Sequence, residues 1–273
     1  MALAPTDFQF VKALVWANAH NVLDAQRDYA VESRLQALAE REGLKSVPDL
    51  VQRLRDKPSL HLIRQVVESL VNHETTFFRD FYPFEVLRTI VLPEVLERRA
   101  KDRTLTILSA ACSSGQEPYS IAMTLSEHFP QLIDWHVRIL ATDYSQTVLE
   151  RAAAARYTQI EVNRGLPAPY LVKYFERNKM HWQLKARIRE MVTFEELNLA
   201  ESWPQLPPVD VVFLRNALIY FDVETKRVCL TQVERCLQPR GFLFMGAAET
   251  TISLSDAFER RSEKVSCYQL KAR

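Results

Sequence analysis

From about Thr104 onward, short apolar runs alternate with amphipathic helical stretches, and no other feature constrains the fold as strongly. Four apolar runs are predicted to be buried strands: TLTILSA, HVRILATD, DVVFLRN and GFLFMGA. Helical spacing of apolar residues predicts helices over residues 117–129, 145–157 and 224–237. This alternation is typical of an α/β fold with a doubly wound parallel sheet. The carboxyl ends of such strands meet at one edge of the sheet, where ligands bind.

The first 75 residues have a different pattern and predict a small helical domain. Apolar residues recur there at helical spacing, with Gly43 and Pro58 between the runs. The chain has 273 residues, which is enough for one large domain and a smaller one. We therefore expect a helical domain over residues 1–75 and a sheet domain over residues 76–273.

Residues 156–192 interrupt the alternation. They contain basic residues together with Pro167, Pro169, Tyr170, Tyr174, Phe175, His181 and Trp182. This composition predicts an insertion within the sheet domain, made of short strands or irregular structure.

The overall composition argues against several classes of function. A formal net charge of +1 gives no support for general nucleic-acid binding. No apolar run approaches the ~20 residues that span a bilayer, and the N-terminus does not resemble a secretory signal. The four cysteines form no CxxC pair, so we expect reduced thiols in a cytoplasmic protein without a bound metal. Nothing predicts an obligate oligomer, and we expect a monomer.

A basic cluster in the helical domain has two interpretations, which the sequence leaves open. Arg53, Arg55, Lys57 and Arg64 lie close together in the chain. A solvated basic face is the common outcome for such a run of charges. A docking surface for an acidic partner helix is the alternative.

The turn after the first predicted strand is poor in glycine. The stretch SAACSSGQEPYSIAM contains only Gly115, whereas a dinucleotide fingerprint has three glycines, one of which admits a pyrophosphate. A cofactor without a pyrophosphate, such as S-adenosylmethionine, has less need of them. Glu117 could then meet the ammonium group of the methionine tail. Alternatively, Ser114 and Glu117 only form a helix capping box.

Asp143 stands at the carboxyl end of the second predicted strand, one strand–helix unit after the glycine turn. A carboxylate at this place accepts hydrogen bonds from both ribose hydroxyls of a bound nucleoside. The alternative is that Asp143 only caps the helix that begins near Ser145. Together, the turn and Asp143 favour a nucleoside ligand.

Two further stretches carry polar groups that could face a substrate. NHETTFFRD lies between the two predicted domains, and its Arg79 can bind a carboxylate with a planar pair of N–H donors. FLRNALIYFD ends a buried strand in Arg215 and Asn216, with Tyr220 and Asp222 beyond. The alternatives are a hinge with core phenylalanines for the first stretch, and a strand end with a helix cap for the second.

In this order, the motifs resemble those of the CheR family of chemoreceptor glutamate methyltransferases. The family pattern contains N-x-T-x-F-F-R, A-x-S-x-G-E-E-P-Y-S-I-A, A-T-D, N-L and R-N-x-x-I-Y-F-D. The corresponding segments here are HETTFFR, AACSSGQEPYSIA, LATDYSQTVLERA, ELNL and LRNALIYFD. The resemblance implies a Rossmann-like methyltransferase domain, an N-terminal helical domain that contacts the receptor helices, and a small β-subdomain at about residues 156–192. Some members use this subdomain to bind a receptor C-terminal tail.

The resemblance also implies roles for individual residues. The reaction would be S-adenosylmethionine-dependent methylation of glutamate carboxylates on chemoreceptors, with S-adenosylhomocysteine as product. Arg79 and Tyr220 would be the catalytic residues that place the substrate carboxylate. The cofactor-binding residues would be His73, Thr75, Arg79, Glu117, Asp143, Asn198, Leu199, Arg215 and Asn216.

The chain departs from the family pattern at three places. His73 stands where the family has asparagine, with Asn72 displaced by one position. Gln116 replaces a glutamate, which removes a charge beside the predicted methionine tail. The segment GAAET stands where Gly-His-Ser-Glu is usual. These differences leave the affinity for the cofactor and the identity of the substrate open.

The predicted chemistry needs no nucleophilic side chain or general base. A glutamate carboxylate has a reference pKa of about 4.3, so it is already ionised at pH 7 and can attack the methyl group directly. Three alternatives remain: a methyltransferase for another protein or a small acid, a non-catalytic S-adenosylmethionine-binding module, and a dinucleotide-dependent oxidoreductase. The single-glycine turn disfavours the last of these.

Overall fold

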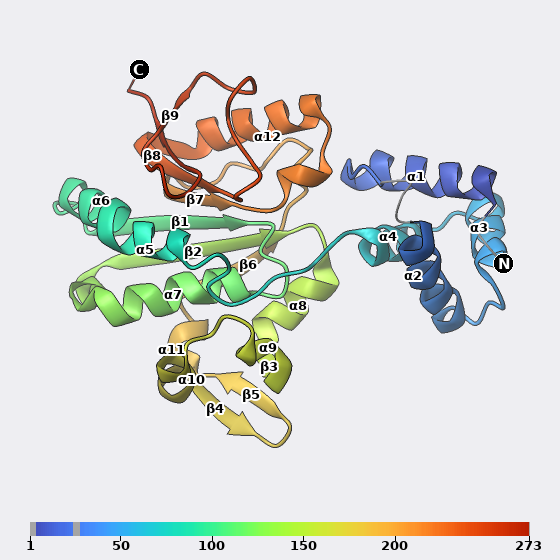
Figure 1. Cartoon of the computed structure of the whole chain (residues 1–273), viewed down its shortest axis with the longest axis horizontal. Coiled ribbons are helices and arrows are strands. Elements are labelled where there is room, and N and C mark those ends of the chain that lie inside the picture. Colours follow the sequence, from blue (N-terminus) through green and yellow to red (C-terminus); the bar gives the residue numbers. More distant parts are fainter. Residues whose placement is uncertain (1–3, 24–27, 273) are drawn as a thin grey trace. The chain divides into compact units, whose positions relative to one another are not determined.

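The computed structural model describes residues 4–23 and 28–272, which form two compact units. The first unit contains the chain up to Asn72 together with Tyr220–Lys226. The second unit contains His73–Ile219 and the chain from Arg227 onward. Figure 1 shows the helices of the first unit in blue and the sheet of the second in green to red.

The first unit is helical, as predicted. Two of its helices begin at a capping serine: Ser46 accepts a hydrogen bond from the Asp49 N–H group, and Ser59 accepts one from that of Leu62. The helices are α1 (Pro5–Ala19), α2 (Asp28–Arg41), α3 (Val47–Asp56) and α4 (Leu60–Leu70). Their inward faces bury apolar side chains that include Val11, Val15, Leu35, Leu38, Leu50, Leu62 and Val66.

The basic cluster of this unit is largely paired within the unit. Arg53 lies 3.5 Å from a carboxylate oxygen of Glu42, and Arg55 lies 2.9 Å from one of Asp7. Arg64 forms an ion pair at 3.1 Å with Glu68, one helical turn further along α4. These intramolecular pairs favour the interpretation of the cluster as a solvated basic face.

The second unit is built on a sheet of seven strands in the described part of the chain, in the order β6-β2-β1-β7-β8-β10-β9. The strands are β1 (Thr104–Ala110), β2 (His136–Asp143), β6 (Val192–Glu196), β7 (Val209–Leu214), β8 (Leu237–Met245), β9 (Phe258–Arg260) and β10 (Cys267–Leu270). Strands β6, β2, β1, β7 and β8 pair with one another in parallel, whereas β10 is antiparallel to both β8 and β9. The predicted α/β fold with a doubly wound sheet is confirmed, and its first two predicted strands coincide with β1 and β2.

Helices cover this sheet and connect its strands. They are α5 (Tyr82–Val86), η2 (Leu87–Val91), α6 (Leu92–Arg98), α7 (Gln116–His128), η3 (Pro130–Asp134), α8 (Gln146–Ala154), η4 (Leu218–Tyr220) and α12 (Val223–Cys236). The core between helices and sheet is apolar, and every residue of β7 is buried. Among the helices of the described residues, none combines the length and the apolar composition that a membrane span requires.

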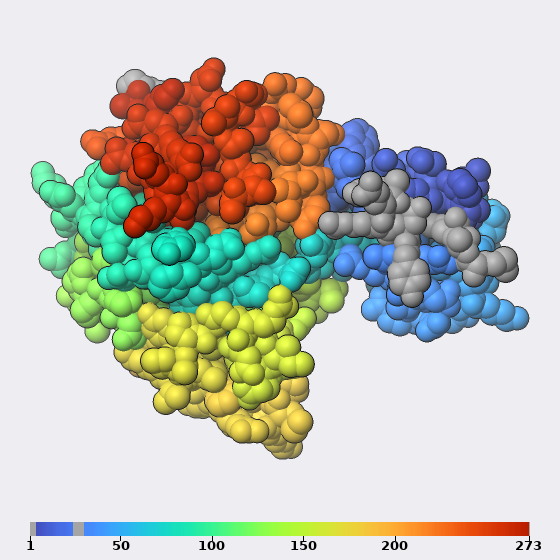
Figure 2. Space-filling model, viewed as in Figure 1, coloured from blue at the N-terminus to red at the C-terminus, as the bar shows by residue number. Residues whose placement is uncertain are grey.

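The insertion between α8 and β6 forms a second, antiparallel sheet in the order β3-β5-β4. Its elements are β3 (Arg156–Thr158), α9 (Gln159–Asn163), α10 (Ala168–Tyr174), β4 (Phe175–Asn178), β5 (His181–Leu184) and α11 (Ala186–Arg189). We call these elements the inserted subdomain. Figure 2 shows its hairpin, in gold, as a projection from the second unit.

The predicted helix over residues 145–157 was too long at its carboxyl end. Helix α8 ends at Ala154, because Ala155 adopts a left-handed conformation with φ 49°. The next residues form β3, in which Tyr157 pairs with Trp182 of β5. Pairing with a distant strand thus outweighs the helical propensity of the alanine-rich sequence.

Candidate functional site

The carboxyl ends of four adjacent parallel strands carry most of the predicted cofactor residues. The strands lie in the order β6-β2-β1-β7, so the segments that follow them meet at one edge of the sheet. Glu117 follows β1, Asp143 ends β2, Asn198 and Leu199 follow β6, and Arg215 and Asn216 follow β7.

The glycine-poor turn between β1 and α7 has left-handed backbone at three residues: φ is 58° at Ala111, 51° at Ser113 and 91° at Gly115. Gly115 is the N-cap residue of α7 and provides no side-chain cap. The alternative of a capping box is therefore wrong: the Ser114 hydroxyl donates instead to Oε1 of Gln116 at 2.8 Å.

Glu117 is buried and its carboxylate is paired with side chains. Its Oε1 accepts a hydrogen bond from the Ser109 hydroxyl at 2.9 Å, and its Oε2 accepts one from Nη1 of Arg215 at 2.9 Å. Burial raises the pKa of Glu117, and the Arg215 guanidinium opposes that rise. Nη2 of Arg215 donates to Asp80 at 2.7 Å and to the carbonyl of Arg79 at 3.1 Å. Arg215 thus joins the start of α7 to the segment that contains Arg79.

Asp143 is also buried, but backbone groups hold its carboxylate. Oδ2 accepts the N–H of Ser113 at 2.9 Å, and Oδ1 accepts that of Ser145 at 3.0 Å. Burial raises the pKa of Asp143, and His73, whose Nδ1 lies 4.0 Å from Oδ1, opposes the rise. The N-cap of α8 is Ser145, whose side chain accepts from the Val148 N–H group, so Asp143 does not have the capping role.

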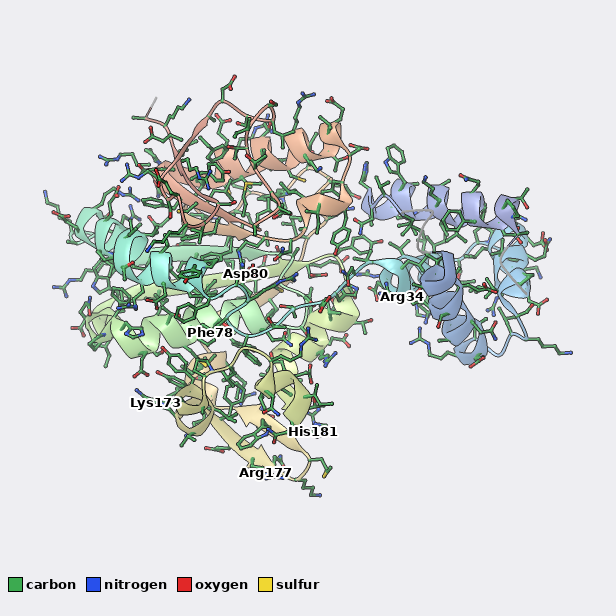
Figure 3. All side chains as sticks on the ribbon, viewed as in Figure 1. Arg34, Phe78, Asp80, Lys173, Arg177 and His181 are labelled. Carbon is green, nitrogen blue, oxygen red and sulfur yellow. The ribbon has the colours of Figure 1, made fainter. Side chains whose placement is uncertain are left out.

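The segment 73–80, which we call the linker, carries His73, Thr75 and Arg79. The His73 carbonyl accepts a hydrogen bond from the Ser113 hydroxyl at 2.6 Å, and the Phe78 N–H group donates to the Ser120 hydroxyl at 2.9 Å. Figure 3 labels Phe78 and Asp80 in this segment.

Arg79 itself is half-buried, and its Nη1 donates to the carbonyl of Glu74 at 2.9 Å. Its hydrogen-bond partner is therefore a backbone group of the linker and not the carboxylate of a surface acid. Phe77 and Phe78 are buried in the core, as the hinge alternative for this segment expected.

The other predicted residues lie along the same edge. The Leu197 N–H group donates to the Asp143 carbonyl at 3.0 Å, which joins the segment after β6 to the end of β2. The Asn198 side chain accepts from the Ala200 N–H group at 3.1 Å, and Leu199 is buried. Asn216 adopts a left-handed conformation with φ 58°.

Tyr220, the second predicted catalytic residue, belongs to the first unit. Its hydroxyl accepts a hydrogen bond from Nδ2 of Asn72 at 2.5 Å, and its carbonyl accepts one from the Val22 N–H group at 2.8 Å. The motif LRNALIYFD therefore begins in the sheet unit and ends in the helical unit.

Glu249 is a buried residue that sequence reasoning did not place in the site. Its Oε2 accepts the N–H groups of Asn216 at 2.8 Å and Gly246 at 2.7 Å, and its Oε1 accepts that of Ile219 at 3.2 Å. The carboxylate thus fixes the backbone turn that carries Asn216. A signal was present, because Glu249 is an acid between small residues just after a predicted buried strand.

The chemistry of this edge fits S-adenosylmethionine. The ligand offers two ribose hydroxyls and an ammonium group as donors, and the edge offers the carboxylates of Glu117 and Asp143. In the described part of the chain each oxygen of Glu117 accepts one hydrogen bond and has a second lone-pair site for a further donor. Asp143 accepts backbone N–H groups of Ser113, Tyr144 and Ser145. Nε of Arg215 is buried and has no hydrogen-bond partner in the described part of the chain.

Comparison with known proteins agrees with this chemistry. Residues 73–267 match the family described as "CheR methyltransferase, SAM binding domain", and residues 6–73 match "CheR methyltransferase, all-alpha domain". Chemotaxis protein methyltransferase 1 of Pseudomonas aeruginosa is 40% identical over 264 residues, which cover 95% of each chain. Chemotaxis protein methyltransferase Cher2 of Pseudomonas putida is 38% identical, with the same 95% coverage of both chains.

A chemotaxis protein methyltransferase of Vibrio parahaemolyticus is 38% identical over 242 residues, which cover 87% of this chain and 86% of the relative. The family match extends over both units, and it includes the strand ends and the linker described above. The chain therefore belongs to the CheR methyltransferase family, and it is a methyltransferase that uses S-adenosylmethionine.

Proposed function

We propose that this chain transfers methyl groups to glutamate side-chain carboxylates on the cytoplasmic signalling helices of chemoreceptors. The products are glutamyl methyl esters and S-adenosylhomocysteine, and the modification adapts the receptors during chemotaxis. Family membership and the names of the relatives support this assignment. The protein would act in the cytoplasm as a monomer, with residues 1–75 as the receptor-contacting domain and residues 76–273 as the methyltransferase domain.

The observation that carries the proposal is the attachment of Arg79 to the cofactor edge. Its carbonyl accepts a hydrogen bond from Arg215, which is itself paired with Glu117. One N–H group of its guanidinium donates to the Glu74 carbonyl, and the others have no partner in the described residues. Arg79 can therefore bind a substrate carboxylate next to the cofactor edge.

In the proposed mechanism the protein contributes position rather than acid–base chemistry. When bound, S-adenosylmethionine supplies an electrophilic methyl group on a sulfonium. The substrate carboxylate is ionised at neutral pH and needs no base. Arg79 orients it for an in-line attack, and Asp143 holds the ribose hydroxyls. Well-oriented proximity of this kind can lower a barrier by about 7–11 kcal/mol.

The other predicted residues have supporting roles in the proposal. His73, Thr75, Asn198, Leu199 and Asn216 would line the cofactor site. Tyr220 would help Arg79 to place the substrate carboxylate.

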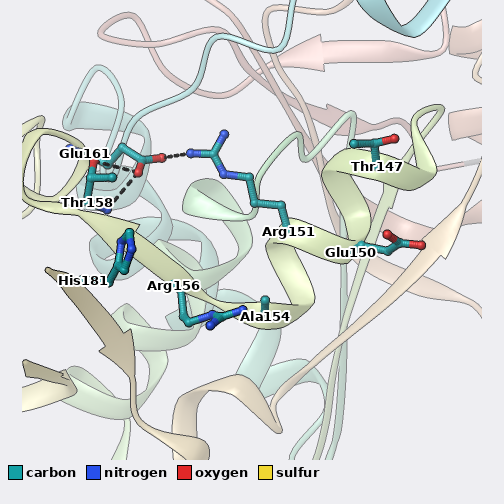
Figure 4. Close-up of a pocket in the computed structure, with 8 residues that line it drawn as sticks. All are labelled: Thr147, Glu150, Arg151, Ala154, Arg156, Thr158, Glu161 and His181. Atoms are coloured by element: carbon teal, nitrogen blue, oxygen red, sulfur yellow. Dashed lines mark hydrogen bonds and ion pairs between the residues drawn. The ribbon is translucent and has the colours of Figure 1, made fainter. Parts of the chain in front are cut away.

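The proposal includes a receptor tail at the inserted subdomain. Two neighbouring pockets, of about 520 and 390 Å³, share Arg156 and His181 in their linings. The lining of the larger pocket is Thr147, Glu150, Arg151, Ala154, Arg156, Thr158, Glu161 and His181 (Figure 4). Arg151 is paired with Glu161, which leaves Arg156 and His181 to meet an acidic peptide. Strands β3 and β4 are the edges of their sheet, so an extended peptide could pair with either.

Labelled S-adenosylmethionine and receptor signalling domains would test the reaction. We expect base-labile label that is released as methanol and that is absent when the receptor's methylated glutamates are replaced by alanine. Base-stable label would contradict the ester. Label on another protein or on a small acid would identify a different substrate, and cofactor binding without transfer to any receptor would indicate a non-catalytic module.

Replacement of Arg79 tests its role separately. Arg79→Ala should abolish methyl transfer while S-adenosylhomocysteine still binds in calorimetry. Transfer at the wild-type rate in this variant would exclude the role of Arg79 as the group that positions the substrate.

A further inference from the structure

The inserted subdomain contacts the linker through a cluster of aromatic rings. The Phe77 ring meets Tyr157 of β3 edge-on, with centroids 4.9 Å apart, and Phe175 of β4 at 5.7 Å. The next residue, Phe78, stacks on Tyr170 of α10 at 5.2 Å. Two consecutive linker residues before Arg79 are therefore packed against three elements of the subdomain.

The backbone of the linker is also in contact with the subdomain. Gly165, between α9 and α10, has φ +86°, and a Cβ atom placed there would lie 2.0 Å from the Phe77 carbonyl oxygen. The adjacent Arg164 forms an ion pair at 2.8 Å with Glu74, whose carbonyl accepts the hydrogen bond from Arg79. The linker is held by this loop at both its side chains and its main chain.

Tyr157 extends from the same cluster to the glycine-poor turn of the cofactor edge. Its ring is fully buried, and its hydroxyl donates to the Ser114 carbonyl at 2.8 Å. In an α-helix the Ser114 carbonyl would accept a hydrogen bond from the N–H group of residue 118. Pro118 has no N–H group and cannot donate it. The phenol supplies the donor that proline cannot, and burial raises its pKa well above the usual range, so it keeps its proton.

The same tyrosine explains why the turn contains a glycine. A Cβ atom at Gly115 would lie 3.2 Å from the Tyr157 hydroxyl oxygen, 3.0 Å from Cβ of Ala152 and 3.1 Å from the Tyr119 ring. Close packing by these side chains, together with the positive φ, restricts the position to glycine. The need for glycine at this position therefore comes from packing within the protein and not from the space that a ligand takes up.

We infer that Tyr157 is a positioning residue, through which the inserted subdomain fixes both the cofactor turn and the linker that carries Arg79. It acts through the Ser114 carbonyl on one side and the Phe77 ring on the other. The subdomain is then part of the support of the methyl-transfer site, in addition to any partner that it binds. The part of this inference that concerns the linker rests on the proposed function of Arg79.

Tyr157→Phe tests the contact with the cofactor turn, because it removes one hydroxyl and keeps the ring. We expect S-adenosylhomocysteine to bind about five- to tenfold more weakly in calorimetry, the effect of one lost buried hydrogen bond. Tyr119→Phe is the matched control: it is equally buried, and its hydroxyl donates to the Ala152 carbonyl at 2.9 Å, outside the turn. The free energy of unfolding of Tyr119→Phe should fall about as much as that of Tyr157→Phe, but Tyr119→Phe should bind S-adenosylhomocysteine as tightly as the wild type.

The inference is overturned if the two tyrosine variants bind S-adenosylhomocysteine equally well. This measurement requires no receptor, so it stands even if the proposed substrate is wrong.

Gly165→Ala tests the contact with the linker. We expect a lower kcat for methyl transfer with an almost unchanged affinity for S-adenosylhomocysteine. Gly43→Ala is its control, because Gly43 also has a positive φ, +70°, but an added Cβ would meet no atom of the described residues within 4 Å, its chain neighbours aside. Equal kcat in Gly165→Ala and wild type would contradict the linker part. Failure of the wild type to methylate any receptor would instead count against the proposed function.

Discussion

The ends of β1 and β2 each carry a buried carboxylate, but the protein stabilises the two in different ways. Glu117 is paired with a hydroxyl and with the guanidinium of Arg215, a residue 98 positions further along the chain. Asp143 receives backbone N–H groups from Ser113 and Ser145. The charge of Glu117 is thus balanced by a side chain that is distant in the sequence, whereas that of Asp143 is stabilised by N–H groups of the main chain nearby.

Because of this difference, we expect substitutions at the Glu117–Arg215 pair to affect mainly the stability of the fold, and substitutions at Asp143 to affect mainly ligand binding. A buried carboxylate that loses the cation paired with it remains as a poorly compensated charge, which destabilises the fold. Backbone donors remain in place when the side chain between them is changed, so substitutions at Asp143 should act mainly on the ligand. The following predictions test this distinction, from the largest expected effect to the smallest.

Arg215→Ala should destabilise the protein by about 3–5 kcal/mol, because it leaves Glu117 buried and unpaired. Urea unfolding measures this effect. In the double variant Glu117→Gln with Arg215→Ala, part of the loss should be recovered, since the amide carries no charge. A single variant as stable as wild type would show that the ion pair does not hold the end of β1.

Asp143→Ala should weaken S-adenosylhomocysteine binding about 30-fold or more, because hydrogen bonds to a charged group contribute about 1.5–3 kcal/mol each. Its unfolding free energy should fall by less than that of Arg215→Ala. Calorimetry and urea unfolding on the same samples compare the two effects. Unchanged affinity would remove the ribose assignment.

As the pH falls, binding of S-adenosylhomocysteine should begin to weaken at a pH above the ordinary aspartate pKa of about 3.9. Burial raises the pKa values of Asp143 and Glu117, so both carboxylates take up protons earlier than exposed ones as the pH falls. In the unfolded chain both groups have lower pKa values and bind protons less readily than in the folded protein. Protonation as the pH falls therefore increases the free energy of unfolding while it weakens ligand binding. Calorimetry from pH 7 downward would show this decline. Asp143→Asn should have a flatter profile, and an affinity that stays constant down to about pH 4 would contradict the effect.

Glu249→Gln should have the smallest effect, about a threefold loss of affinity for S-adenosylhomocysteine. The amide oxygen can still accept the N–H groups of Asn216 and Gly246, whereas its NH₂ group would face the N–H of Ile219. Glu249→Ala, which removes all three acceptor contacts, should lose several times more. Equal affinities in both variants would show that Glu249 does not position Asn216.

Local pattern was sufficient to predict β1 and β2 and to place Glu117 and Asp143 at their ends. Each strand has an apolar core, Leu105–Leu108 interrupted by Thr106 in β1 and Ile139–Ala141 in β2, and the following turns contain the small and polar residues that a parallel sheet leaves at its carboxyl edge. The helical domain was predicted for a similar reason, because its apolar residues recur along one face of each helix.

The contacts that complete the site are not local, and sequence pattern alone could not supply them. Tyr157 stood where the predicted helix over residues 145–157 overlapped the predicted insertion over residues 156–192. It pairs with a strand 25 residues later and donates to a turn 43 residues earlier. The joining of Arg79 to Glu117 through Arg215 likewise depends on the packing of three separate segments. The resemblance to a family placed Arg79, Glu117 and Arg215 in one list of site residues, but that list did not include Tyr157.

The two open edges of the β3-β5-β4 sheet have a consequence for association between copies of the protein. Exposed strand edges are templates for pairing with other chains, and charged side chains on them discourage it. Arg156 on β3 and Arg177 on β4 are exposed and carry like charges (Figure 3 labels Arg177). Two copies that approached edge to edge would bring these arginines together, whereas an acidic strand would not be repelled. The charges that select a partner would thus also protect the hairpin from aggregation, and their neutralisation should lower the concentration at which the protein begins to self-associate.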